Sequence, residues 1–317
     1  MVTGSPFRLA LILLLGLGLA GCTPAPPPPR SPDLAFADHP LVDRIWSVAQ
    51  RRFLNRHEFL TVLAGSHFII LGEAHDNPRH HELQAWVLRA IAEQARFPAV
   101  AMEMIGEDQA GGLRLFYAEP RANADKLPFF LNWAESGWPD WTLYAPVANT
   151  AVRFQMPLAW ANFSRGLVVA MHDQGWAALP PETRTDLALP PALPAALRPA
   201  LIADIADNHC GSLPPDKIEH FAQIQFARDA LMARRMMDAA TDDGAVLITG
   251  AGHARTDRGV PYHLERLGAR SAVASVGFVE VATDKAEPQS YELPFDLVWF
   301  TPGLRRADPC ETFRARR

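Results

Sequence analysis

The chain has 317 residues, of which 49% are hydrophobic and 21% charged, and its formal net charge is −5. This composition is that of a globular protein and excludes low-complexity disorder, collagen and disulfide-rich miniproteins. The 35 acidic and 30 basic residues show no basic footprint, so we expect no nucleic-acid partner.

The amino terminus has the pattern of a bacterial lipoprotein signal. Arg8 precedes an apolar run at residues 9–19, which is shorter than the ~20 residues that a membrane-spanning helix needs. The run ends in Leu-Ala-Gly-Cys, which resembles the lipobox, where a peptidase cuts before the cysteine and the cysteine carries lipid. We therefore expect a signal peptide at residues 1–21 and lipidation at Cys22. An ordinary signal peptide with an incidental cysteine is the alternative.

A proline-rich segment follows the predicted lipid site. Residues 22–40 begin with a proline run, which favours an extended tether that holds the folded part away from the lipid surface. Thr23, not Asp, follows Cys22. In the enteric sorting rule this favours the outer membrane of a Gram-negative bacterium, so we expect a lipid-anchored protein of the cell envelope that faces the periplasm.

Alternating strand and helix signals follow the tether. Short apolar runs of β-forming residues predict strands at residues 67–72, 99–104, 158–161, 245–249, 275–281 and 295–301. Helical spacing is found at residues 41–54, at 78–91 after Asn77, at 220–240 and from Val260 onward. This order predicts an α/β fold with three layers (α/β/α), a mostly parallel central sheet and a small helical cap.

The predicted domain covers residues 41–305, with the cap inserted at about 106–215 and a C-terminal tail at 306–317. Cys210 and Cys310 are the two cysteines beyond the lipid site. An oxidising envelope compartment permits a disulfide between them, but the sequence does not give their distance.

Two apolar strands end in the same pattern, Gly-x-x-His. Gly72 leads to Glu73 and His75, and Gly250 leads to His253. Glu103 lies at the end of the strand predicted at residues 99–104, which comes between these two patterns in the sequence. Because the carboxyl ends of parallel strands lie at one edge of a sheet, we expect these side chains to lie close together.

Imidazole and carboxylate donors of this kind suit a divalent metal such as Zn, Mn, Fe or Co. The predicted metal ligands are Glu73, His75, Glu103 and His253. In a metal-dependent hydrolase of the peptidase or esterase type, the same residues would be catalytic, with Glu73 or Glu103 as the general base. His80 and His81 open the following helix, and we interpret them as solvated polar residues.

The residues from Leu71 to Pro78, followed by His80-His81 and Gln84, resemble the ChaN-like haem-binding lipoproteins. That family belongs to one superfamily with the Tiki-type metallopeptidases and the erythromycin esterases. The resemblance covers roughly residues 68–301. In one position this chain departs from the family pattern, because it has Arg228-Asp229 where Trp-Asp is usual before Met-Ala.

The resemblance implies an α/β/α fold with a small cap and binding of haem, or of iron derived from it, in iron uptake. Trp141 and Tyr144 from an aromatic segment, together with His75 and His253, are the candidate haem-contacting residues. The sequence does not identify an uptake-receptor partner, and a homodimer is one of the open oligomeric states. A metal-dependent hydrolase is the alternative function.

Overall fold

The computed structural model describes residues 1, 34–269, 272–306 and 310–311. The predicted signal peptide, Cys22 and the tether up to residue 33 lie outside these residues. The described part contains a main sheet of eight strands in the order β3-β2-β9-β8-β4-β7-β5-β6. These strands are β2 (Ile45–Ser47), β3 (Arg52–Leu54), β4 (Phe68–Glu73), β5 (Ala99–Gly106), β6 (Leu158–Asn162), β7 (Ala245–Gly250), β8 (Val273–Glu280) and β9 (Leu297–Thr301).

The pairs from β9 across to β6 are all parallel, whereas β2 pairs antiparallel with both β3 and β9. The mostly parallel sheet predicted from the sequence is therefore confirmed. A separate two-stranded sheet joins β1 (Leu34–Ala35) to β10 (Gly303–Leu304). The central strands are apolar because both faces of the sheet are covered. In β4, Ile69 and Leu71 enter one core, and Phe68 and Ile70 enter the other.

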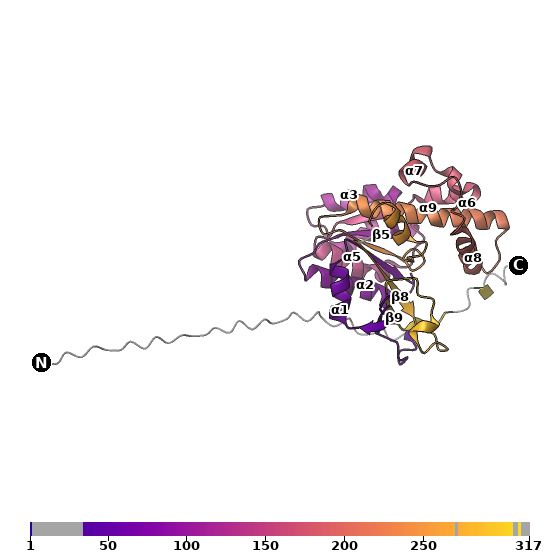
Figure 1. The fold of residues 1–317 in the computed structure, drawn as a ribbon. Helices are drawn as coiled ribbons and strands as arrows, with labels where there is room; N and C mark the ends of the chain where they lie inside the picture. Colours follow the sequence, from indigo (N-terminus) through magenta and orange to yellow (C-terminus); the bar gives the residue numbers. More distant parts are fainter. Residues whose placement is uncertain (2–33, 270–271, 307–309, 312–317) are drawn as a thin grey trace.

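Helices cover both faces of the sheet (Figure 1). The helices of the described part are α1 (Arg56–Ala64), α2 (Pro78–Ala92), α3 (Ala110–Ala118), α4 (Leu127–Phe130), α5 (Trp141–Arg153), α6 (Arg165–Gln174), α7 (Pro181–Asp186), α8 (Arg198–Asn208), α9 (Pro215–Ala239) and α10 (Val260–Arg266). Helices α1, α2 and α5 contribute to the core on one face, and α9 and α10 to the core on the other. Three layers result, as predicted.

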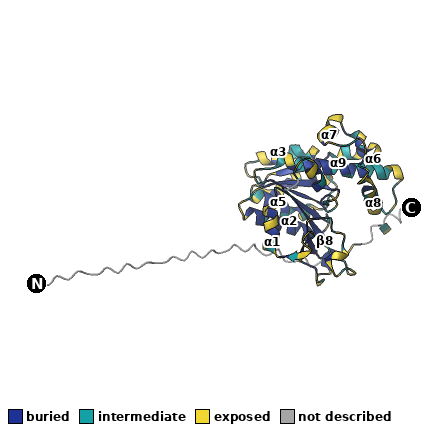
Figure 2. Ribbon diagram, viewed as in Figure 1, coloured by how far each residue is buried: buried dark blue, intermediate teal, exposed yellow. Residues whose placement is uncertain are grey.

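The segment predicted as a cap is divided between two places. Helices α3 and α5 pack into the same core as α2, because Phe116 and Val147 are fully buried there. Helices α6 and α8 instead form a third core against α9, with Phe226 and Leu231 from that helix. Figure 2 shows buried residues along α9 and exposed ones on α7, at the outside of the cap. The separate helical layer therefore begins near Phe163.

The predicted helix over residues 41–54 is wrong. This stretch forms β2 and β3, whose antiparallel hairpin places Trp46 opposite Phe53. Arg51 has a positive φ of 52°, which reverses the chain between the two strands. The helix α1 begins only after Asn55, whose side chain accepts a hydrogen bond from the Glu58 amide in a capping box.

A disulfide joins Cys210, just beyond the end of α8, to Cys310 near the C-terminus. The bridge closes a loop across 100 positions of sequence and ties the end of the chain to the cap. Within the described residues, no helix combines the length and the apolar character needed to span a membrane.

Candidate functional site

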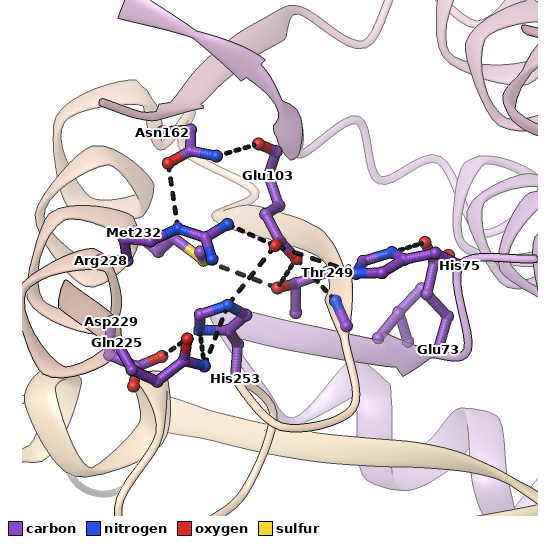
Figure 3. A network of polar contacts seen from close by, with 12 residues as sticks. Glu73, His75, Glu103, Asn162, Gln225, Arg228, Asp229, Met232, Thr249 and His253 are labelled. Carbon is purple, nitrogen blue, oxygen red and sulfur yellow. Dashed lines mark hydrogen bonds and ion pairs between the residues drawn. The ribbon is translucent and has the colours of Figure 1, made fainter. Parts of the chain in front are cut away.

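Seven polar side chains gather where β4, β5 and β7 end; all of them except His81 are labelled in Figure 3. We call this group the strand-end cluster; it consists of Glu73, His75, His81, Glu103, Arg228, Asp229 and His253. Figure 3 shows Arg228 from α9 and His253 from the loop after β7 both directed toward Glu103. The four residues predicted as ligands are therefore brought to one place, together with three others.

Glu73 is the centre of one half of the cluster. Its Oε1 lies 3.0 Å from Nδ1 of His75, and its Oε2 lies 3.0 Å from Nδ1 of His81. Burial raises the pKa of Glu73, but the neighbouring His81 and His75 outweigh it and lower the pKa to about 2. The carboxylate is ionised and can only accept, so Nδ1 of His75 donates to it, and Nε2 of His75 is the outer nitrogen.

His81 is held on two sides. Its Nε2 lies 3.0 Å from the carbonyl oxygen of His75, and a carbonyl can only accept, so Nε2 carries a proton. Burial lowers the pKa of His81, but the charge of Glu73 and its hydrogen bond raise it overall. The interpretation of His81 as a solvated helix-start residue is wrong, since the side chain is fully buried.

His80 is also buried, in contrast to the expectation from the sequence. Its Nδ1 accepts a hydrogen bond from the Ala74 amide, and its Nε2 lies 2.8 Å from the hydroxyl of Thr301. Burial lowers the pKa of His80 to about 3, so this ring is neutral and fixes the turn after β4.

Glu103 is the centre of the other half. Its Oε2 accepts hydrogen bonds of 2.7 Å from the Thr249 hydroxyl and from the Gly250 amide. Its Oε1 lies 2.5 Å from Nη2 of Arg228 and 3.4 Å from Nε2 of His253. Burial raises the pKa of Glu103, but His253 and Arg228 hold it well below the ordinary value.

His253 connects Glu103 to Asp229. The Nδ1 of His253 lies 2.6 Å from Oδ1 of Asp229, and both side chains are buried. Burial lowers the pKa of His253, but Glu103 and Asp229 raise it to about 9. His253 is therefore an imidazolium at neutral pH in this arrangement.

Close backbone packing brings the two Gly-x-x-His turns together. A Cβ on Gly72 would lie 2.5 Å from the Cβ of Ala254, and a Cβ on Gly250 would lie 2.9 Å from Nε2 of His75. At Gly72 the neighbours are Ala254 and the backbone of Ala251, which leave no room for a side chain, whereas at Gly250 a Cβ would have to displace the His75 ring. The glycines therefore let the end of β4 and the loop after β7 approach each other.

The geometry does not support the predicted divalent metal. Within the part of the chain that the structure describes, no group of three or more His, Cys, Asp or Glu residues could hold a metal ion. Oε1 of Glu73 and both oxygens of Glu103 face protein donors, Oε2 of Glu73 lies 3.0 Å from Nδ1 of His81, and Arg228 places a permanent positive charge against Glu103. A cation among these groups would lie beside the Arg228 guanidinium.

The two aromatic candidates lie on α5. Tyr144 is fully buried, with its ring 4.5 Å from that of His81 and 5.3 Å from that of Trp133. Burial, aided by Glu73, raises the pKa of Tyr144, so its hydroxyl stays protonated. Trp141 packs against Trp133 at the border of the same core. Neither residue lines the pocket that opens beside the strand-end cluster.

A pocket of about 650 Å³ opens beside the cluster, between β5, the segment around α4 and the start of α6. We call it the site pocket. Its apolar lining consists of Met104, Phe130, Leu131, Trp138, Phe163 and Val168, and Arg165 and Arg228 lie among its polar residues. Trp138 connects the pocket to the cluster, because its ring lies 5.0 Å from that of His75.

Three members of the cluster carry roles that the sequence did not reveal: His81, Arg228 and Asp229. Arg228 and Asp229 are neighbours on α9, and both reach Glu103 or its partner His253. The only sequence signal for them was their place in the family resemblance, where Arg228 was the departure from the pattern.

The comparisons with known proteins agree with this architecture. A family model for "Haem-binding uptake, Tiki superfamily, ChaN" matches residues 59–264. The fold is similar to ChaN of Campylobacter jejuni, solved for cofacial haem binding, with 20% identity over 80% of this chain and 95% of that one and a TM-score of 0.60. An erythromycin esterase, EreC in its open conformation, aligns at 14% identity over 86% of each chain, with a TM-score of 0.41. No curated protein matches the chain. The family match covers more than half of the sequence, and this chain therefore belongs to the ChaN haem-binding uptake family of the Tiki superfamily.

Proposed function

We propose that this protein binds haem in the site pocket and serves iron uptake in the bacterial cell envelope. The observation that carries the proposal is a pocket of about 650 Å³ with both apolar and polar lining, next to His75, in a member of a haem-binding uptake family. Its volume lies in the range of about 300–1,000 Å³ that is typical of ligand pockets.

The residues present fit a haem as cargo. A haem needs an apolar slot and a donor to the iron, such as His, Met or Tyr. The slot is provided by the apolar lining around Phe130 and Phe163. His75 is the donor that we assign. It is not a lining residue of the pocket, but its side chain is 34% exposed, its Nδ1 is bound to Glu73, and its ring lies 5.0 Å from that of the lining residue Trp138. A carboxylate on the far nitrogen fixes the ring and raises its basicity toward a metal.

A haem titration of the purified protein tests this proposal. We expect a saturable change in the Soret band at about one haem per site, and a weaker affinity in His75→Ala. His57→Ala is the control, because His57 is an exposed residue of α1. A spectrum that matches haem in buffer at every ratio would overturn the proposal.

We further propose that Cys22 carries lipid and anchors the chain, with residues 22–40 as the tether. The Cys210–Cys310 disulfide supports an exported protein, since structural disulfides persist in oxidising compartments. Metabolic labelling with a fatty acid should mark the wild type and not Cys22→Ser. Label retained at this site in the variant would refute the lipoprotein assignment.

A hydrolase of the peptidase or esterase type is the second candidate, because His75 has the arrangement of a general base. Its Nδ1 donates to buried Glu73 while Nε2 is the outer nitrogen, 4.0 Å from Glu103. A panel of peptides and esters should show turnover that His75→Ala abolishes and His57→Ala preserves. No turnover of any substrate by the wild type would remove this candidate.

A further inference from the structure

We propose that the site pocket recognises its ligand through a carboxylate, which Arg228 and Arg165 bind from two walls of the pocket. The inference rests on the proposed function, since haem carries two propionates on an apolar ring. In this proposal the two arginines make the pocket bind an amphipathic carboxylate more tightly than an uncharged ligand of the same shape.

Arg228 is held in a fixed position at the inner wall. Its Nε lies 3.1 Å from Oδ1 of Asn162, and its Nη2 lies 2.5 Å from Oε1 of Glu103. The Asn162 amide in turn donates to the backbone carbonyl of Glu103. Among the described residues, no hydrogen bond uses Nη1 of Arg228. The side chain is 16% exposed and lines the pocket, so this nitrogen is a positioned donor.

The Glu103 carboxylate is not available to accept a hydrogen bond from the ligand. It is not part of the pocket lining, and its two oxygens already bind Arg228, Thr249 and the Gly250 amide. A ligand in the pocket therefore meets the donors of Arg228 and not the carboxylate behind them. Because the guanidinium is already ordered, less side-chain entropy is lost on binding.

Arg165 lies at the outer wall, as the first residue of α6. Its Nη1 donates to the backbone carbonyl of Glu135 at 2.5 Å. Within the described residues, no carboxylate lies within ion-pair distance of this guanidinium. Asp108 and Glu135 also line the pocket, and like Arg165 they are solvent-exposed, so water screens all three charges, whereas Arg228 is only 16% exposed.

The rest of the lining fixes the class of ligand. Phe130, Trp138 and Phe163 add apolar surface to the pocket that the two arginines also line. An apolar body with a charged edge satisfies both kinds of wall. Arginine binds carboxylates with paired hydrogen bonds, so a flat, mostly apolar molecule with one or two carboxylates is the ligand that this lining selects.

The test compares ferric haem with its dimethyl ester, in which both propionates are uncharged. Wild-type protein should bind haem about 10-fold more tightly than the ester, as expected for a hydrogen bond between charged groups. Arg165→Gln should remove most of this preference. Arg228→Lys keeps a positive charge beside Glu103 but loses the planar fork, and should weaken haem and leave the ester unchanged.

Arg114→Gln is the matched control. Arg114 lies on α3 and lines a separate hollow with Tyr117 and Trp160, so its loss should leave both affinities as in the wild type. Equal affinity of wild type for haem and ester, or wild-type haem binding in both Arg165→Gln and Arg228→Lys, overturns the inference and leaves haem binding intact. Failure of the wild type to bind either porphyrin overturns the proposed function and this inference with it.

Discussion

Glu103 is predicted to be a main electrostatic support of the folded state, and Glu103→Gln tests this. The substitution keeps the size of the side chain and an acceptor for the Gly250 amide. It removes the charge that faces Arg228 and His253, which lie 2.5 Å and 3.4 Å from Oε1. Breaking one partner of a buried ion pair costs about 3–5 kcal/mol. We expect about 3 kcal/mol, the lower end, because Arg228 is partly solvated.

For a domain of this size, each 1 kcal/mol shifts the melting temperature by roughly 2–4 °C, so Glu103→Gln should lower it by about 6–12 °C. Circular dichroism during heating and during urea unfolding measures both quantities. Glu219→Gln is the matched control, since its 2.7 Å ion pair with Arg198 is largely exposed and should contribute less than about 1 kcal/mol. Equal destabilisation by the two substitutions would refute the reasoning.

Three further predictions follow from the same contacts. In the folded protein the pKa of His253 is about 9, above the ordinary 6.5, so the stabilisation from its charge is complete below pH 6.5 and is lost as pH rises through about 9. Urea unfolding between these pH values should show this loss of stability. An identical pH profile in His253→Ala would contradict the prediction. Gly250→Ala should displace the His75 ring, whose Nε2 would lie 2.9 Å from the new Cβ, and an unchanged His75 NMR signal would argue against that contact. Cys210→Ser should lower the free energy of unfolding by roughly 2–4 kcal/mol, because the disulfide closes a 100-residue loop. A reducing agent should lower the melting temperature of the wild type and not that of the variant. A variant as stable as the oxidised wild type would disprove this.

The sequence was sufficient to predict the six parallel strands of the sheet and four of the seven residues of the strand-end cluster. Apolar runs such as residues 245–249 identify buried strands, and parallel strands bring their carboxyl ends to one edge. Glu73, His75, Glu103 and His253 therefore meet as the repeated Gly-x-x-His pattern predicted. What the pattern did not show is that these acids and histidines pair with one another and with Arg228. Among the described residues, no group of three or more of them could hold a metal ion.

The remaining features depend on contacts between distant parts of the chain. Residues 45–47 form a strand because β9, about 250 positions later, offers them a pairing edge. Arg228 reaches Glu103 across 125 positions, and helical periodicity shows which residues share a face of α9 but not which strand end that face meets. His81 is buried in part because Tyr144 of α5, 63 positions later, packs with its ring 4.5 Å from that of His81.

The most direct test of the central claim is to fill the site pocket. Val168 lines the pocket, whereas its neighbour Val169 on α6 is 57% exposed and does not. Haem affinity, followed through the Soret band, should fall by at least about 10-fold in Val168→Trp, because the indole would occupy the slot, and should stay at the wild-type value in Val169→Trp. Haem affinity equal to the wild type in a folded Val168→Trp protein would contradict the assignment of this pocket as the haem site.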